Sequence, residues 1–147
     1  RFAGYCAGLA GNGLPVLPEL CWSAEDYGMR AWEGEVLDRI LPQAAHVLIR
    51  EQKVDAIIAG NDLWGVGLIH RMRVKVPQDV SVVGYGDFEY CCWSSTPQLA
   101  SINHGNRQIA AELIRMIDDL IRGVRTREEI AAAPVDVKSY FLPRASA

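Results

Sequence analysis

The strongest constraint on the fold lies in the middle of the chain, where two strand patterns flank one helix pattern. Residues 54–59 and residues 80–83 are short apolar runs rich in β-branched side chains, and each is followed by glycine. Such runs are typical of strands that are buried on both faces, as in a parallel sheet. Asp62 suits the N-cap of a helix, which the pattern extends to about Arg73. This segment therefore predicts a βαβ unit in an α/β fold.

Polar residues follow both of these strands. Asn61 and Asp62 come directly after the first strand, and residues 85–87 come after the second. In open parallel sheets, ligands bind beyond the carboxyl ends of the strands. The sequence therefore predicts that a binding site, if the chain has one, lies at this edge of the sheet.

The remaining elements follow from apolar periodicity and from glycine and proline positions. Helices are predicted at residues 1–11, 24–52 and 106–122, with a kink or a new start at Pro42, and residues 128–133 are predicted as a short helix or loop. Strands are predicted near residues 17–21 and 99–103, with a final edge strand within residues 134–142 and a loop over residues 84–97. The apolar stripe of the helix at 106–122 is expected to pack inward; it comprises Ile109, Leu113, Ile117 and Leu120.

Composition limits the class of protein. The 147 residues are 50% hydrophobic, which suits one compact domain with a sizeable core, and the net charge of −3 argues against direct binding of nucleic acid. No apolar run is long enough for a membrane helix, and no signal peptide is visible. The four cysteines show no metal-ligand spacing, so we expect reduced thiols in a cytoplasmic protein.

An enzyme requires a catalytic constellation, and the chain contains no GxSxG, phosphate-loop or HExxH motif. A Cys91 or Cys92 nucleophile with His104 as its base is possible by residue type alone. We therefore expect a protein that is not an enzyme and that uses no cofactor and no metal.

The segments AGND, at residues 59–62, and VPQDVSVVGYGD, at residues 76–87, resemble the effector-binding domain of the lactose-repressor (LacI/GalR) family of bacterial regulators. The resemblance extends from Arg1 to Ser146. It implies a three-layer α/β/α fold with a mostly parallel sheet, like one lobe of a type I periplasmic-binding-protein domain. It also implies that residues 1–147 are the C-terminal part of a sugar- or effector-binding domain, without the first lobe and the DNA-binding domain.

The resemblance suggests five ligand-binding residues, namely Arg1, Trp22, Asn61, Asp87 and His104. The family usually has Gly-Tyr-Asp-Asp where this chain has Gly-Tyr-Gly-Asp, so Gly86 replaces the usual aspartate contact. Either Asp87 takes over that contact or the contact is lost.

Each of the five residues also has a structural interpretation. Trp22 could be a core or rim aromatic, and Asn61 could cap the following helix. Arg1 could be a solvated charge, Asp87 could cap its loop, and His104 could be a hydrogen-bonded histidine without a ligand role.

The function implied by the resemblance is sensing of a small effector, a sugar or a nucleoside-like compound, that controls DNA binding allosterically. The expected partner is a second copy in a homodimer. DNA would be bound only through an absent N-terminal domain, and no membrane would be involved. The alternative is a periplasmic-type solute-binding receptor for a sugar, serving uptake or chemotaxis.

Overall fold

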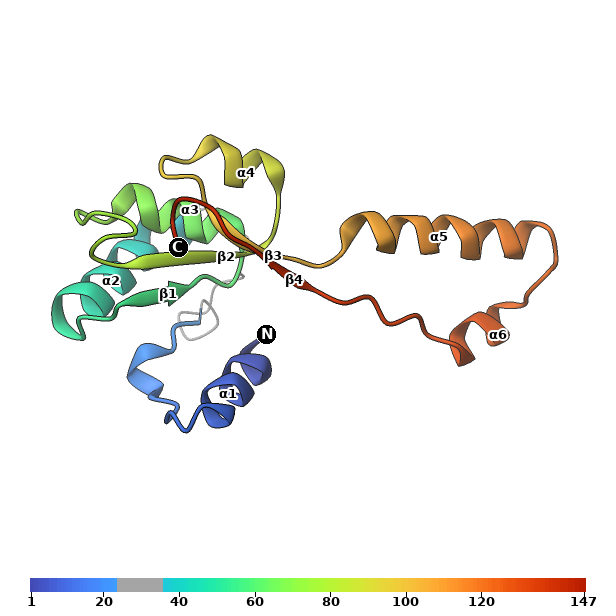
Figure 1. Cartoon of the computed structure of the whole chain (residues 1–147), viewed down its shortest axis with the longest axis horizontal. Helices are drawn as coiled ribbons and strands as arrows, with labels where there is room; N and C mark the ends of the chain where they lie inside the picture. Colours follow the sequence, from blue (N-terminus) through green and yellow to red (C-terminus); the bar gives the residue numbers. More distant parts are fainter. Residues whose placement is uncertain (24–35) are drawn as a thin grey trace.

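The computed structural model describes residues 1–23 and 36–147 and contains one four-stranded sheet in the order β1-β2-β3-β4. The first three strands run parallel: β1 (Ala56–Ile58), β2 (Ser81–Gly86) and β3 (Ala100–Asn103). The last strand, β4 (Tyr140–Leu142), pairs antiparallel with β3. The predicted α/β class and the mostly parallel sheet are therefore confirmed (Figure 1).

The predicted βαβ unit is present as β1, α3 (Asp62–Arg71) and β2. Its apolar positions face the core: Ile69 and Met72 are buried, and Val66 is partly buried against them. A methyl group added at Gly65 would lie 2.9 Å from the Leu99 side chain, which is itself fully buried. Close packing of α3 on the strands therefore explains a glycine inside this helix.

The long helix predicted before β1 is divided into segments. Within the described residues it consists of a π-helical turn, η3 (Val36–Ile40), then α2 (Leu41–His46) and a second π-helical turn, η4 (Val47–Glu51). Pro42 lies in the first turn of α2, directly after the π-helical turn η3, and proline is tolerated in the first turn of an α-helix. The expectation of a new start at Pro42 is thus confirmed, whereas the part of the prediction on residues 24–35 lies outside the described residues.

Two predictions about local structure are wrong. The segment predicted as a strand near residues 17–21 contains a 3₁₀ turn, η1 (Pro18–Leu20), since Pro18 has no N–H to donate to a ladder and favours a turn. The loop predicted over residues 84–97 contains the end of β2 and a short helix, α4 (Glu89–Ser94), in which Cys92 is the buried residue. A helix of six residues with one buried side chain is too short to show a helical period in the sequence.

Helices α2, α3 and α4 pack together against the main core. Helix α1 (Phe2–Gly11) is set apart from them (Figure 1). No residue of α1 is buried. Within residues 1–23 and 36–147, no helix combines the length and the apolar character that crossing a membrane requires.

The chain between β3 and β4 forms an arm that projects from the sheet (Figure 1). The arm contains α5 (Asn106–Ile121) and α6 (Arg127–Ala132), and α6 begins with a capping box at Thr126 and Glu129. No residue of α5 is buried, and Leu113 is 53% exposed. The prediction that the stripe of α5 packs inward is therefore wrong for this chain, because within the described residues the segment before β4 lies against only part of it, through Val135 and Val137.

The segment after β4 returns to the sheet and inserts Ser146 between β2 and β3. The Ser146 hydroxyl donates to the Val82 carbonyl at 2.6 Å and accepts from the Ala100 amide at 2.8 Å. The Ser146 backbone bonds to Val82 and to Gln98. Ser146 is fully buried, so it completes the sheet where the two strands begin.

Candidate functional site

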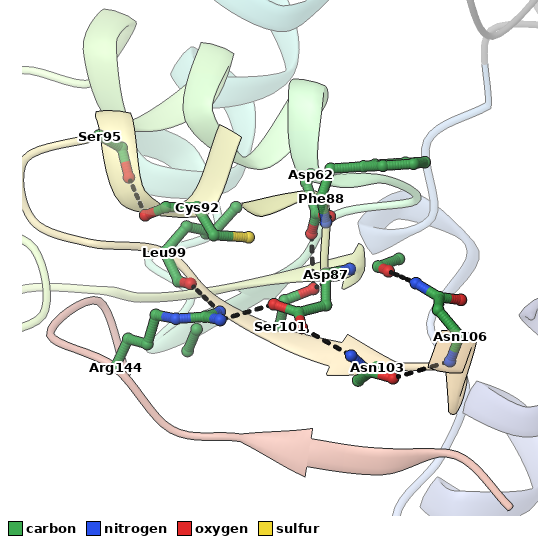
Figure 2. Close-up of polar contacts among 12 residues, drawn as sticks. Asp62, Asp87, Phe88, Cys92, Ser95, Leu99, Ser101, Asn103, Asn106 and Arg144 are labelled. Atoms are coloured by element: carbon green, nitrogen blue, oxygen red, sulfur yellow. Dashed lines mark hydrogen bonds and ion pairs between the residues drawn. The ribbon is translucent and has the colours of Figure 1, made fainter. Parts of the chain in front are cut away.

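A buried carboxylate organises the carboxyl end of the sheet. Asp62 is the first residue of α3 and is fully buried. Its oxygens accept hydrogen bonds from the Ser101 hydroxyl at 2.5 Å and from the Phe88 amide at 2.7 Å (Figure 2). Asp62 is therefore not the N-cap that the sequence suggested. The N-cap is Asn61, whose side-chain oxygen accepts from the Trp64 amide at 2.8 Å.

Asp87 belongs to the same network. Its side chain is 7% exposed and accepts from the Arg144 guanidinium at 2.6 Å and from the Asn103 amide at 2.6 Å (Figure 2). Burial raises the pKa of the Asp87 carboxyl, but the hydrogen bonds from Arg144 and Asn103 and the charge of Arg144 hold that pKa below its ordinary value. Asp87 is therefore ionised and engaged inside the protein.

Gly86, which replaces the family's usual aspartate, has a conformation that suits glycine. Its φ of +126° lies in a region that side-chain-bearing residues rarely adopt. A methyl group here would lie 3.1 Å from the Phe88 ring and 3.3 Å from an Asp62 oxygen. In this turn, position 86 therefore contributes backbone and no carboxylate.

Arg1, Tyr85 and His104 form a cluster on the opposite face of the sheet from Asp62. Tyr85 lies between Gly84 and Gly86 in β2, so its side chain points away from α3. The Arg1 guanidinium carbon lies 4.7 Å from the centre of the Tyr85 ring, and the His104 ring meets the same ring edge-on at 4.5 Å. Both residues named from the sequence therefore meet on Tyr85.

Asn61 lies beside this cluster, at the N-cap of α3. The Arg1 guanidinium donates to the Gly60 carbonyl at 2.7 Å, which places Arg1 beside Asn61. Trp22 and Trp64 both pack against Ile40 and are partly buried. The structure thus brings Arg1 and His104 together on Tyr85, with Asn61 next to the Gly60 carbonyl that Arg1 binds. It places Trp22 against Ile40, and Asp87 faces the internal network.

The cysteines and the histidine do not form a nucleophile–base arrangement. Burial and the neighbouring Asp62 carboxylate raise the pKa of the Cys92 thiol to about 12, and they also raise the pKa of Cys91. A thiol with a raised pKa gives little thiolate, the nucleophilic form. His104 contacts Tyr85 on the other side of β2. The described residues also contain no cluster of His, Cys, Asp or Glu that could hold a metal ion.

Sequence reasoning missed several residues of this region, namely Tyr85, Ser101, Asn103, Asn106 and Arg144. Arg144 follows the last strand and binds Asp87 across 57 positions of the chain, a pairing that no local pattern announces. Tyr85 could have been found, since strand alternation places it opposite the two glycines that flank it.

Comparison with known proteins agrees with this architecture. A family model described as a periplasmic binding protein-like domain matches residues 1–146. The ribose operon repressor of Lactococcus lactis is 26% identical over 73% of this chain and 32% of its own length. The HTH-type transcriptional regulator CelR of Thermobifida fusca is 34% identical over 54% of this chain and 24% of its own length.

The solved structure of a transcriptional regulator CelR–cellobiose complex is 27% identical, with a TM-score of 0.73, and the match covers 100% of this chain and 42% of that one. The chain thus spans a quarter to a third of the length of these two curated relatives. It belongs to the periplasmic binding protein-like domain family, in the form found in transcriptional regulators of the lactose-repressor type.

Proposed function

We propose that this chain is the C-terminal part of the effector-binding domain of a bacterial transcriptional regulator and that it senses a small, sugar-like molecule. The observation that carries the proposal is the cluster of Arg1, Tyr85 and His104, with Asn61 beside it, at the carboxyl ends of parallel strands. The fold places ligands at this edge. The CelR–cellobiose complex supports a sugar-like effector.

The proposed ligand contacts combine donors with apolar faces. Arg1, Asn61 and His104 offer hydrogen-bond donors, and Trp22 and Tyr85 offer aromatic surface for the C–H face of a sugar. Asp87 supports this surface indirectly, because its bonds to Arg144 and Asn103 hold the turn that follows Tyr85.

The proposal also includes two further domains of the protein and a second copy of it. An N-terminal domain would bind DNA, a first lobe would cover the α5 face, and a second copy would complete a homodimer in the cytoplasm. The uncovered stripe of α5 and the exposed aromatics of α4, Tyr90 at 86% and Trp93 at 60%, provide apolar surface for such contacts. The solute-receptor alternative has no comparable support, since the curated relatives are regulators.

The test uses the full-length natural protein and a panel of sugars, with operator DNA affinity measured with and without each sugar. A variant that separates ligand binding from helix capping is Asn61→Ser, because serine caps helices about as well as asparagine but lacks the amide donor. For an effector found in the panel, we expect Asn61→Ser to weaken binding about tenfold, equivalent to about 1.4 kcal/mol.

The matched control is Asn12→Ser, which changes an exposed asparagine that bonds only within α1 and its cap. Equal affinity in Asn61→Ser and the parent protein would contradict the assigned contact. A protein whose DNA affinity responds to no small molecule would contradict the proposed function itself.

A further inference from the structure

The acceptor groups at the carboxyl end of the sheet are occupied within the protein. Asp62 is fully buried and accepts two hydrogen bonds, and Asp87 accepts from Arg144 and Asn103 with 7% of its side chain exposed. Gly86 has no side chain to contribute. The described residues of this edge therefore present no available carboxylate to a ligand.

The donor groups are arranged differently. Within residues 1–23 and 36–147, the Arg1 side chain has two contacts, a bond to the Gly60 carbonyl and the face of the Tyr85 ring. Neither contact carries a full negative charge, and an arginine has five N–H donors. The guanidinium is exposed and held in one place by these two contacts. A fixed cation therefore stands at an edge of the sheet whose described carboxylates are already occupied.

We infer that the effector of this site carries an acidic group, a carboxylate or a phosphate, which Arg1 binds. This inference rests on the proposed function and specifies its ligand class. An acidic group supplies hydrogen-bond acceptors for the donors at this edge. Charge-assisted hydrogen bonds to a guanidinium are stronger than hydrogen bonds between neutral groups. A neutral sugar must instead donate its hydroxyls to an edge whose described carboxylates, Asp62 and Asp87, are already engaged, and an unpaired buried hydroxyl weakens binding.

The experiment uses the full-length natural protein and matched pairs of compounds that differ in the acidic group. Glucuronate is compared with glucose, galacturonate with galactose, and ribose 5-phosphate with ribose, so that carboxylate and phosphate are tested separately. Dissociation constants come from calorimetry at low and at high salt. We expect an acid to bind at least about tenfold more tightly than its neutral parent, and high salt to reduce the difference.

Two variants assign the preference to Arg1. Arg1→Gln should reduce the ratio between an acid and its neutral parent to about one, whereas Arg50→Gln, an exposed arginine of η4, should leave the ratio unchanged. A neutral sugar that binds as tightly as its acid, or an acid preference that survives Arg1→Gln, would overturn the inference.

These outcomes are distinguishable from failure of the proposed function. If neutral sugars bind and alter DNA affinity while their acids do not, the proposed function stands and the acidic effector is wrong. If no member of any pair binds and DNA affinity does not respond, both are wrong.

Discussion

At the scale of single residues, the ion pair between Arg144 and Asp87 joins the segment after β4 to the turn after β2. Both side chains are nearly buried, at 11% and 7% exposure. Removing one partner from a buried pair leaves an uncompensated charge. We expect Arg144→Gln to lower the free energy of unfolding by about 3 kcal/mol at pH 7, measured by urea denaturation. Arg122→Gln, which breaks an exposed pair with Asp118, should cost less than about 0.5 kcal/mol.

The same pair predicts a pH dependence with a definite sign. The folded-state pKa of Asp87 is lowered, so the stabilisation is present above the unfolded-state pKa of about 3.9 and is lost as the pH falls through the folded-state pKa. The difference in unfolding free energy between Arg144→Gln and the parent should therefore shrink as the pH is lowered below about 4. A difference that stays constant down to pH 2 would show that Asp87 is not the group responsible.

Gly84 provides a second residue-scale prediction. A methyl group at this position would overlap the Asp62 carboxylate and approach Leu99 to 2.8 Å. Since both neighbours are fully buried, we expect Gly84→Ala to destabilise the fold by about 1–3 kcal/mol in denaturant unfolding. Gly8→Ala is the control, because a methyl group there meets nothing within 4 Å and lies in a helix, where alanine is preferred.

Only some of these residue roles could be predicted from the sequence. Asn61 was recognised as a possible cap because its side chain acts locally, three residues from its partner. Arg144 and Ser101 were not recognised, because their roles depend on partners 57 and 39 positions away. The inward turn of Asp87 is likewise a consequence of those distant partners.

At the scale of elements, the leucines of α5 and of the segment just before β3 differ in how much they stabilise the fold. Leu113 is 53% exposed on α5, whereas Leu99, just before β3, is fully buried. In this chain we expect Leu113→Ala to change the unfolding free energy by less than about 1 kcal/mol and Leu99→Ala to lower it by about 2–5 kcal/mol. A large loss for Leu113→Ala would mean that the α5 face is covered in solution.

Elements were predictable where the local pattern and the packing agree. The strands of the βαβ unit and the position of α5 followed from periodicity, and both are present. Periodicity identified the apolar face of α5 but not its partner, because that partner is not among the described residues. The 3₁₀ turn at Pro18 and the short helix α4 are too brief to show a period.

At the scale of the whole molecule, exposed apolar surface predicts association. The α5 stripe is uncovered, and β1 pairs with a neighbour on one side only within the described sheet. We expect this chain to sediment as a dimer or larger species at micromolar concentration and Leu113→Glu to reduce its association. A monomer mass in sedimentation equilibrium would contradict this prediction.

The charge balance leads to a prediction about DNA. The net charge of −3 disfavours the phosphate contacts that DNA binding requires. We expect no mobility shift of duplex DNA by this segment alone at physiological salt. Sub-micromolar binding that weakens with added salt would contradict this expectation.

The insertion of Ser146 between β2 and β3 has a consequence for the order of events during synthesis. Residues 54–103 contain the βαβ unit and β3, but the start of the sheet lacks the hydrogen bonds to Val82 and Ala100 until Ser146 has left the ribosome. The sheet therefore lacks these hydrogen bonds while the ribosome is still translating the arm. This interval favours early protection of β2 and β3 by a chaperone or by the preceding part of the chain.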